Sequence, residues 1–315
     1  MVSISEMLNA KAECQTAGRR DSSERVLNRP IRNQHLAFSD WYTALMPFDI
    51  PAVVVANTRL SADYNVLALA APDIAAAATP GQFVMVKAAA GNDPLLRRPF
   101  SLFEVLRDAE GRATGLSILV KRIGPSTRLL YDARVGDTVA CLGPLGQPFT
   151  LLDPPAEGWM VAGGVGLAPF WTLAEALVAR GVKTTLFYGA RKGEELFYLD
   201  YFRRLRVELV LTTEDGSVGE KGRVIAPLER RLASHPSDQA ITLYACGPEG
   251  MLEATAHTAA KYERHCEVSV ERIMGCGMGG CYSCIVPMKS ATGGFHHVRS
   301  CMAGPVLDAA QIVWE

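Results

Sequence analysis

The stretch Trp159-Met160-Val161-Ala162-Gly163-Gly164-Val165-Gly166-Leu167-Ala168-Pro169 decides the fold of this 315-residue chain. It begins with a short apolar run, continues through a glycine-rich turn and leads into an apolar segment. We expect that segment to be a helix from about residue 169 to 180. A strand, a tight glycine turn and a helix in this order predict the first βαβ unit of a parallel sheet.

The residues after this stretch continue the alternation. We expect strands at 184–188, 208–211 and 241–245, and helices at 195–205, 224–233 and 248–262. Strict alternation of this kind is typical of right-handed βαβ connections. Residues 154–265, which begin with a Pro/Gly-containing linker at 154–158, are therefore predicted to form a doubly wound parallel-sheet domain.

The residues before this stretch have a different texture. Between 51 and 153, short apolar runs near 53–55, 66–69, 83–86, 116–120 and 138–142 are separated by turn residues such as Pro80-Gly81 and Gly136-Asp137. Several short strands at this spacing predict a small antiparallel barrel. The expected fold class is thus mixed β and α/β.

Residues 1–50 form an N-terminal extension with balanced charges and poor periodicity. Within it, 36–48 has aromatic and leucine side chains at a spacing compatible with a short amphipathic helix. Two interpretations stay open for the extension: a partly ordered arm, or a docking element for a partner subunit.

Composition narrows the possible partners and the compartment. The net charge is −1 and the chain has no basic block, which disfavours nucleic acid as a partner. Residues 1–20 lack the apolar core of a secretory signal, and the apolar run at 159–179 contains glycines, Pro169 and Glu175, which favours a strand, a turn and a helix over a membrane span. We expect a soluble protein in the reducing cytoplasm.

Four of the eight cysteines form one set near the end of the chain, and the other four are scattered, unlike a secreted disulfide framework. Cys276, Cys281 and Cys284 follow the spacing C-x4-C-x2-C, and Cys301 stands further on. This is the plant-type pattern for a [2Fe–2S] cluster, and the interleaved glycines allow backbone N–H groups close to sulfur. Zinc, which usually takes two separate short ligand pairs, and metal-free core thiols are the alternatives. We predict a [2Fe–2S] module at 266–315.

A histidine pair, His296 and His297, lies between the last two cysteines. Two histidines replace two cysteines in Rieske centres. Because four cysteines already satisfy the cluster, we expect both histidines to be exposed loop residues.

Two turns of the α/β domain have the composition of nucleotide-binding turns. Gly164 and Gly166 lie in a glycine turn before a helix, where backbone N–H groups and the helix dipole favour phosphate. Cys246-Gly247-Pro248 follows a later strand and also precedes a helix. Ligands of open α/β sheets bind beyond the carboxyl ends of the strands, so both turns should face one crevice. A tight turn with a buried thiol is the alternative at Cys246.

Two segments of the barrel half carry a possible flavin grip. In Arg98-Pro99-Phe100-Ser101, the arginine can neutralise a diphosphate, the aromatic ring can cover a flat ring and the hydroxyl can bond a ring nitrogen. An ordinary edge strand is the alternative. Gly124-Pro125-Ser126-Thr127 is similar to a second phosphate-facing turn, which is compatible with a helix start capped by Ser or Thr.

Residues from about 51 to 315 resemble the ferredoxin-NADP⁺ reductase superfamily, and within it the electron-transfer subunits of NAD-dependent (class 1B) dihydroorotate dehydrogenases. Besides the segments already quoted, the pieces that carry the resemblance are Pro80-Gly81-Gln82-Phe83, Leu95-Leu96-Arg97, Gly143-Pro144-Leu145-Gly146, Tyr188-Gly189-Ala190-Arg191 and Gly304-Pro305-Val306-Leu307-Asp308. The resemblance implies an FAD-binding barrel at 51–153, an NAD-binding domain at 154–265 and the cluster module at 266–315.

The resemblance also assigns residues by position. FAD would be held by Arg98, Pro99, Phe100, Ser101, Gly124, Ser126 and Thr127; NAD(H) by Gly164, Gly166, Cys246, Gly247 and Pro248; and iron by Cys276, Cys281, Cys284 and Cys301. Ser101 and Cys246 are the candidates beside the reacting atoms, as tuning residues rather than covalent catalysts.

The implied activity is that of an NAD(P)H-linked flavoprotein oxidoreductase. We expect NADH to give a hydride to the flavin near Ser101, and electrons to pass singly through the cluster to a partner. The implied partner is the FMN-containing dihydroorotate dehydrogenase catalytic subunit of pyrimidine biosynthesis, in a hetero-oligomer. Residues 1–50 and the long segment between Cys284 and Cys301 depart from the family pattern and leave the partner in doubt.

Other interpretations stay open. The chain could be a reductase component serving a different oxidoreductase or an oxygenase. It could also be a non-catalytic module with a structural zinc and a vestigial nucleotide site. Arg191 and Lys192, after the second strand of the sheet, could meet the 2′-phosphate of NADPH or be solvated loop residues, and the resemblance favours NAD.

Overall fold

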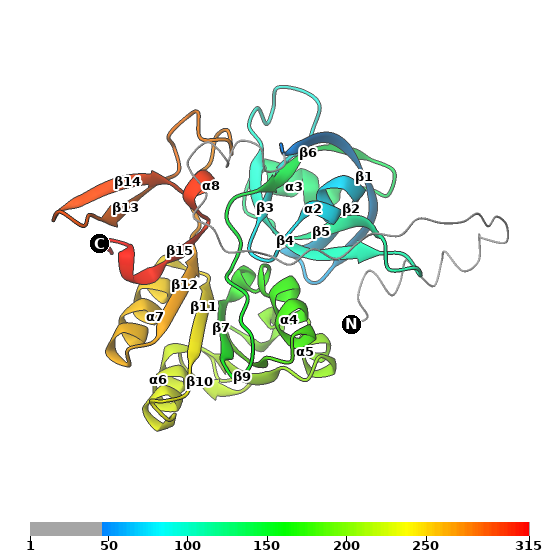
Figure 1. Cartoon of the computed structure of the whole chain (residues 1–315). Helices are drawn as coiled ribbons and strands as arrows, with labels where there is room; N and C mark the ends of the chain where they lie inside the picture. Colours follow the sequence, from blue (N-terminus) through cyan, green and yellow to red (C-terminus); the bar gives the residue numbers. More distant parts are fainter. Residues whose placement is uncertain (1–45, 315) are drawn as a thin grey trace, which may run out of the picture.

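The computed structural model describes residues 46–314 of the chain. An antiparallel barrel lies above a helix-flanked parallel sheet, and the C-terminal segment lies beside the barrel and above one side of the sheet (Figure 1). No helix among residues 46–314 is long and apolar enough to cross a membrane. The apolar run at 159–179 is a strand, a turn and a helix, as predicted.

Six antiparallel strands close the predicted barrel in the order β1-β2-β5-β4-β3-β6. They are β1 (Phe48–Arg59), β2 (Tyr64–Ala70), β3 (Phe83–Lys87), β4 (Arg98–Arg107), β5 (Ala113–Lys121) and β6 (Thr138–Leu145), with helices α2 (Pro72–Ala77) and α3 (Pro125–Asp132) in the connections. Side chains such as Val54, Leu67 and Ile118 fill the interior and are fully buried. Closure gives every strand two neighbours, so β4, which contains Arg98 to Ser101, is not an edge strand.

The predicted helix at 36–48 lies outside the described residues as far as residue 45, and at its end the prediction is wrong. Phe48 begins β1 and pairs with Gly143 of β6. Half-buried Phe48 and Ile50 alternate with exposed Asp49 and Pro51. A period of two residues suits a strand with one face toward the core, so this pattern, and not a helical one, decides the structure here.

The second layer is a seven-stranded sheet in the order β10-β9-β8-β7-β11-β12-β15. The strands β7 (Glu157–Gly163), β8 (Lys183–Ala190), β9 (Glu208–Thr213), β10 (Glu220–Lys221), β11 (Ile241–Cys246) and β12 (His265–Ser269) are parallel. The predicted parallel sheet is confirmed. Its first strand begins at Glu157, inside the expected linker, and β15 (Val306–Asp308) adds an antiparallel edge.

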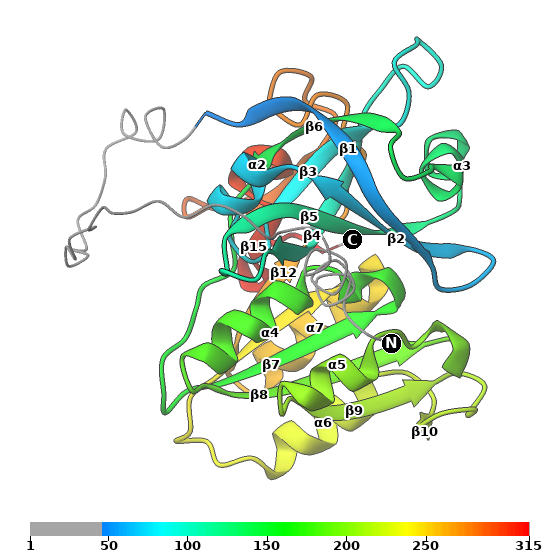
Figure 2. The same ribbon diagram turned by 90° about the vertical axis from the view of Figure 1, so that its right-hand side faces the viewer.

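The sheet is covered by α4 (Phe170–Ala179) and α5 (Leu199–Arg204) on one face and by α6 (Ile225–Ser234) and α7 (Glu249–Lys261) on the other. Helix α5 begins later than predicted because Tyr198 has a left-handed backbone, with φ of 58°. The face with α4 and α5 turns toward the barrel (Figure 2), and Phe103 of β4 packs edge-on against Trp171 of α4 at 4.8 Å between ring centroids. The two domains thus share one aromatic core.

The C-terminal segment leaves β12, forms the cysteine loop at 270–284 and then a hairpin of β13 (Ile285–Lys289) and β14 (Phe295–Arg299). A short helix α8 (Ser300–Ala303) and β15 follow. His296 and His297 are exposed as predicted, but they lie on β14 and not in a loop. The turn before them is tight, because Gly293 and Gly294 supply φ of 91° and 76°.

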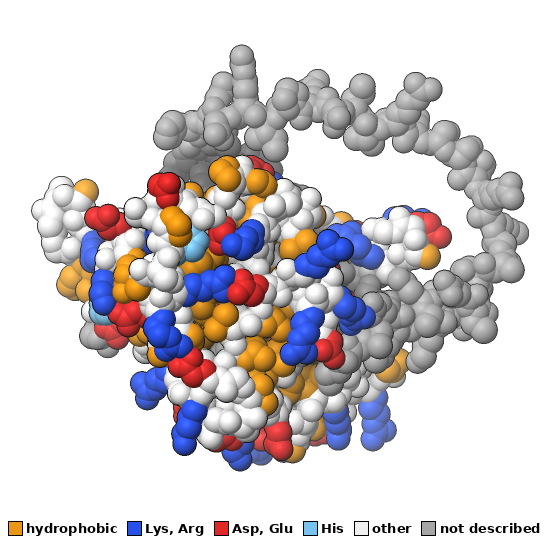
Figure 3. Space-filling model, turned by 90° about the horizontal axis from the view of Figure 1, so that it is seen from below, with side chains coloured by type: hydrophobic (Ala, Val, Ile, Leu, Met, Phe, Trp, Pro, Cys, Tyr) orange, Lys and Arg blue, Asp and Glu red, His pale blue; other side chains and the backbone are white. Residues whose placement is uncertain are grey.

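Charges of both signs are interspersed on the face drawn in Figure 3, and hydrophobic side chains lie between them. Neither Lys and Arg nor Asp and Glu form a single block on this face. The pattern is that of an ordinary mixed surface and agrees with a net charge of −1.

Candidate functional site

The two predicted nucleotide turns meet at the point where the strand order of the sheet reverses. Strands β8 and β9 lie on one side of β7, and β11 lies on the other, so the ends of β7 and β11 flank the crevice of an open α/β sheet. The turn at Gly164–Leu167 follows β7, and Gly247 and Pro248 follow β11. A Cβ atom on Gly247 would lie 3.0 Å from the Gly163 nitrogen, so the two turns are in direct contact.

Gly164 and Gly166 lie in different surroundings. A Cβ on Gly164, where φ is +55°, would meet nothing within 4 Å, so this side of the turn is open. A Cβ on Gly166 would collide with the Cys246 carbonyl group. The Tyr188 hydroxyl lies 3.3 Å from the Gly164 carbonyl oxygen and 3.0 Å from that of Glu195, and burial raises the pKa of Tyr188. The protonated Tyr188 hydroxyl therefore holds the Gly164 carbonyl group in place by a hydrogen bond.

Cys246 and Ser101 come from different domains. Cys246 ends β11 of the sheet, whereas Ser101 lies on β4 of the barrel. Burial raises the pKa of the Cys246 thiol to about 12, so it stays protonated at neutral pH. A protonated thiol is a poor nucleophile, which agrees with a tuning role rather than covalent catalysis.

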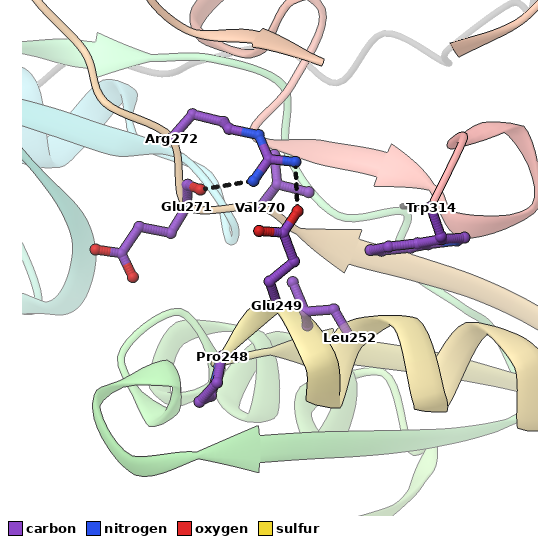
Figure 4. A pocket seen from close by; sticks show the side chains of 8 residues that line it. Pro248, Glu249, Leu252, Val270, Glu271, Arg272 and Trp314 are labelled. Atoms are coloured by element: carbon purple, nitrogen blue, oxygen red, sulfur yellow. Dashed lines mark hydrogen bonds and ion pairs between the residues drawn. The ribbon is translucent and has the colours of Figure 1, made fainter. Parts of the chain in front are cut away.

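A pocket of about 210 Å³ lies beside Pro248, between the start of α7 and the segment that leads to the cysteine loop (Figure 4). An ion pair spans it: Arg272 Nη2 donates to Glu249 Oε1 at 2.7 Å. Trp314 lines the pocket away from Pro248. The ion pair therefore connects the nucleotide turn after β11 with the chain entering the cysteine loop.

A second pocket, of about 390 Å³, lies at the carboxyl ends of β8 and β9 and is lined by Lys192, Glu194 and Asp215, among others. Hydrogen bonds from the side chain and backbone of Ser217 lower the pKa of Asp215, so this carboxylate is ionised at neutral pH. The Arg191 guanidinium forms an ion pair, because its Nη2 donates to Glu195 Oε1 at 2.5 Å. Acidic groups thus offset both cations of this loop.

In the barrel half of the site, the Ser126 hydroxyl at the start of α3 suits a ligand. Gly124 caps α3, and its N–H and that of Ile123 both donate to Thr127 Oγ1 at 2.9 Å. Ser126 is buried, and its Oγ has no partner within residues 46–314. A buried hydroxyl without a partner costs about 1–3 kcal/mol. A Cβ on Gly124 would meet nothing within 4 Å, so a hydroxyl, helix N–H groups and open space fit the diphosphate of FAD.

The four predicted iron ligands come together as two interacting pairs, Cys276 with Cys281 and Cys284 with Cys301. Cys281 is exposed, whereas Cys284 and Cys301 are each 2% exposed, in an apolar cluster. Two thiolate pairs suit a two-iron core with two ligands per iron. Among the described residues, no three His, Cys, Asp or Glu side chains lie close enough together to hold one metal ion.

The loop around the cysteines has the backbone that a cluster needs. Gly277 and Gly279 have φ of +73° and +80°, and a Cβ on Gly277 would lie 2.6 Å from Met85 Cγ. The Met278 N–H points to Cys276 Sγ at 3.4 Å, and the Gly279 N–H interacts with the Cys301 sulfur. Hydrogen bonds from Ser283 and the backbone lower the pKa of Cys281 to about 6. Soft sulfur donors ringed by N–H groups fit a [2Fe–2S] cluster.

Strand β3 separates the candidate flavin residues from the cysteines. Phe83 pairs with Ser101 of β4, and Met85 pairs with Pro99. Phe83 and Met85 also pack in the same buried cluster as Cys284 and Cys301. Neighbouring strands are about 4.8 Å apart, so a single strand lies between the two predicted redox groups.

Sequence reasoning did not identify three side chains that shape the site. Ser283 contacts Cys281 Sγ at 3.1 Å, and its position between two ligands was a usable signal. Arg299 Nη1 donates to the Gly279 carbonyl oxygen at 2.8 Å, and its guanidinium lies 4.8 Å from the Tyr282 ring centroid. No local pattern marks an arginine 20 residues from its partner. The third is Met85, which packs against the cysteine loop, although its sequence position predicts only an apolar strand residue of the barrel.

Two family models match the chain. A model described as an oxidoreductase NAD-binding domain matches residues 160–257. A model described as the iron–sulfur cluster binding domain of dihydroorotate dehydrogenase B matches residues 271–313. The two matched ranges contain the two nucleotide turns and the four cysteines.

Curated relatives cover most of the chain. The dihydroorotate dehydrogenase B (NAD(+)), electron transfer subunit of Desulforamulus reducens is 39% identical over 245 residues, which are 78% of this chain and 90% of the relative. The protein of the same name from Geobacillus kaustophilus is 38% identical over 264 residues, which are 83% of this chain and 97% of the relative.

Solved structures share the architecture. An NADH-dependent reduced ferredoxin-NADP oxidoreductase superimposes with a TM-score of 0.72 at 26% identity, over 84% of this chain and 90% of that chain. A ferredoxin NADP⁺ reductase from Neisseria gonorrhoeae, solved with bound FAD and NADP, gives a TM-score of 0.56 at 21% identity, over 68% of this chain and 91% of that chain. The second likeness concerns the fold alone.

Proposed function

This chain belongs to the family of dihydroorotate dehydrogenase B electron-transfer subunits, and we propose that it passes electrons between NAD(H) and a partner redox enzyme through FAD and a [2Fe–2S] cluster. The partner is the FMN-containing catalytic subunit of dihydroorotate dehydrogenase, in pyrimidine biosynthesis. The two proteins act as a hetero-oligomer.

The observation that carries this proposal is the position of β3. Its residue Phe83 pairs with Ser101 and packs with Cys284 and Cys301. With FAD held at β4 and the cluster held by the cysteines, a single strand would lie between the two groups, which is a short path for an electron. We call the loop 270–284 with Cys301 the cysteine cradle. Within it, the buried pair Cys284 and Cys301 lies on the side of β3 and the proposed flavin site.

The chain's own residues bind and orient the groups. Ser126 and the start of α3 would hold the FAD diphosphate, and Arg98, Pro99, Phe100 and Ser101 would line the flavin. Gly164 and Gly166 would let the dinucleotide approach the backbone, and Cys246, Gly247 and Pro248 would border the nicotinamide. A bound flavin supplies the exchange between hydride chemistry and single electrons. Four cysteines, Cys276, Cys281, Cys284 and Cys301, would hold the cluster.

The exposed side of the cysteine loop, around Cys281, is where electrons would pass to the partner. Met278 and Tyr282 flank exposed Cys281 and are 56% and 63% exposed, and Ile273 before the loop is 86% exposed. Large apolar side chains at the surface next to a redox group suit a protein partner that excludes water from the contact. The catalytic subunit would dock on this face.

NADH is the expected nucleotide rather than NADPH. The extra 2′-phosphate of NADPH is met in dinucleotide folds by a cation near the second strand. Here Arg191 is paired with Glu195, and Lys192 lies in a pocket with Glu194 and ionised Asp215. The 2′-phosphate of NADPH would therefore lie near these carboxylates, which would repel it.

The three functions divide along the chain. Residues 51–153 would hold FAD, 154–265 NAD and 266–315 the cluster, while β15 and β12 join the last two units in one sheet. Strand β1 already begins at Phe48, so the barrel includes the last residues of the predicted 1–50 extension. The described cysteines carry free thiols, which supports a reducing, cytoplasmic location.

The test is reconstitution of the full-length chain with an FMN-containing dihydroorotate dehydrogenase catalytic subunit of the same organism. Absorption spectra should show FAD and a [2Fe–2S] cluster in this chain, and the complex should form NADH from dihydroorotate and NAD⁺. Affinity purification from the native host then identifies the physiological partner. Recovery of a different oxidoreductase or an oxygenase, with no activity toward dihydroorotate, would contradict the pyrimidine assignment.

A further inference from the structure

The Ser283 hydroxyl lies within hydrogen-bond distance of the exposed Cys281 sulfur. Its Oγ lies 3.1 Å from Cys281 Sγ. The same oxygen accepts a hydrogen bond from the Gly275 N–H at 3.0 Å. A Cβ on Gly275 would lie 3.2 Å from Cys281 Sγ, so a larger residue here would require the sulfur to move by a few tenths of an ångström.

The direction of the Ser283 hydrogen bond follows from the chemistry of its neighbours. A hydroxyl has one proton to donate and two lone pairs. The Gly275 N–H takes one lone pair, and this leaves the proton for sulfur. A cysteine bound to iron is a thiolate and has no proton, so in the loaded protein Ser283 is the donor and Cys281 the acceptor.

On this basis we propose that Ser283 is a positioning residue that raises the reduction potential of the [2Fe–2S] cluster through Cys281. This inference rests on the proposed function, since it needs the cluster. Reduction adds negative charge to the cluster, and a hydrogen bond to a ligand sulfur stabilises the more negative state. Removing the donor therefore makes the cluster harder to reduce.

The cysteine ligands differ in burial, and this difference explains why a donor next to Cys281 affects the cluster. Cys284 and Cys301 are buried among Phe83, Met85 and other apolar side chains, where added charge is disfavoured. Cys281 lies at the exposed side, where solvent and Ser283 both favour added charge. Ser283 thus acts on the ligand pair that faces the proposed partner, and it favours the reduced state of the cluster whichever side supplies the electron.

The experiment compares the midpoint potential of the cluster in the full-length wild type and Ser283→Ala, by reductive titration followed by EPR and absorption. Ser283→Ala should keep its cluster, because all four cysteines and the backbone donors remain. Its potential should fall by the equivalent of roughly a tenfold change in the reduction equilibrium, about 59 mV for a one-electron couple. Ser290→Ala is the control, because that hydroxyl bonds Thr292 in the hairpin turn of the same module, and it should leave the potential unchanged.

A second pair of variants isolates the hydroxyl from the shape of the side chain. Ser283→Thr and Ser283→Val have the same shape, but only the former has a donor. A potential near that of the wild type for Thr and a lower one for Val would support the proposal. Equal potentials for Thr and Val, or an unchanged potential in a cluster-loaded Ser283→Ala, would overturn it, as would loss of the cluster from Ser283→Ala and Ser283→Val alike. A wild-type chain with no [2Fe–2S] signal would instead overturn the proposed function as well.

Discussion

Gly166 lies against the end of β11 so closely that a Cβ atom on it would stand 2.0 Å from the Cys246 carbonyl oxygen. This contact joins the turn after β7, the first strand of the parallel sheet, to the turn after β11, the fifth parallel strand in the chain. The two turns of the proposed NAD(H) site can therefore pack together only because Gly166 has no side chain. A larger residue cannot be accommodated by a rotamer change, because the obstacle is backbone.

Replacing Gly166 by Ala should separate the two turns. We expect weaker NADH binding, seen as a rise of at least tenfold in the NADH concentration needed for half-maximal flavin bleaching, together with a lower Tm. Gly250→Ala is the matched control, since that glycine is in the first turn of α7 and a Cβ there meets nothing within 4 Å. The control should keep NADH binding and gain about 0.5–1 kcal/mol in stability. Equal behaviour of the two variants would contradict the close-contact argument.

Replacing Cys284 by Ser should divide the two redox steps. Cys284 is a predicted iron ligand and belongs to neither nucleotide turn, so the cluster signals in EPR and absorption should disappear while NADH still bleaches the flavin. Cys266→Ser is the control, because Cys266 is a buried thiol within β12; it should retain the cluster. Loss of flavin bleaching along with the cluster in Cys284→Ser would count against this division of labour.

Replacing Ser126 by Ala should weaken FAD binding without harming the fold. The Ser126 hydroxyl is buried and has no partner among residues 46–314, so its removal should leave the Tm of the flavin-free chain unchanged or slightly raised. The Kd for FAD, measured by flavin fluorescence, should rise about tenfold if that hydroxyl bonds a ligand oxygen, a loss of about 1.4 kcal/mol.

Thr127→Val is the contrasting variant. Thr127 Oγ1 accepts the N–H groups at the start of α3, so its loss should cost about 1 kcal/mol of stability. If Ser126→Ala lowered the Tm and left FAD affinity intact, the diphosphate assignment would be wrong.

Acid should destabilise the sheet through Glu157. This buried carboxylate accepts hydrogen bonds from Trp159 Nε1 at 2.9 Å, Lys183 Nζ at 2.7 Å and Gln239 Nε2 at 2.8 Å. Desolvation favours the neutral acid, but the hydrogen bonds from Lys183 and Trp159 and the charge of Lys183 prevail and lower the pKa of Glu157 below its usual 4.5. A lowered pKa in the folded state means that the stabilisation is present above pH 4.5 and is lost as the pH falls through the folded value.

Glu157→Gln tests this contribution. The amide can accept from only some of the three donors, so we expect a loss of about 2 kcal/mol at pH 7 in urea unfolding. The remaining stability should depend less on pH below 4.5 than that of the wild type. Glu229→Gln, which breaks an exposed pair with Lys261, is the control and should cost less than about 1 kcal/mol. A similar loss in both variants would show that burial of Glu157 is not the cause.

The sequence was sufficient for the layers because its periodicities are local. Alternation of strands and helices from Trp159 onward, and short runs between Pro/Gly turns before it, specify the sheet and the barrel. The aromatic spacing over 36–48 wrongly predicts a helix at Phe48, because spacing over a short window suits either period. The end of the chain was less predictable: that β15 pairs with β12 depends on a contact between residues some 40 positions apart, which no local pattern encodes.

The candidate residues of the site follow the same rule. Glycines and cysteines at fixed spacings mark the turns, because only these residues tolerate the backbone or bind the metal. The spatial relationship of the groups was not predictable, since Phe83 and Met85 are ordinary apolar strand residues in the sequence. Only the barrel register shows that they separate Ser101 and Pro99 from the cysteines.

The close of the chain has a consequence for how the protein is made. Gly146 after β6 has φ of +79°, and a Cβ there would lie 2.5 Å from Pro305 Cδ, while the Gln147 N–H donates to the Gly304 carbonyl oxygen at 2.6 Å. The barrel is thus joined to residues that follow Cys301. Domains fold in order from the N-terminus during synthesis, so the barrel and strands β7 to β12 precede the fourth cysteine and its support. The four-cysteine site can therefore be completed only after the barrel and most of the sheet have been synthesised.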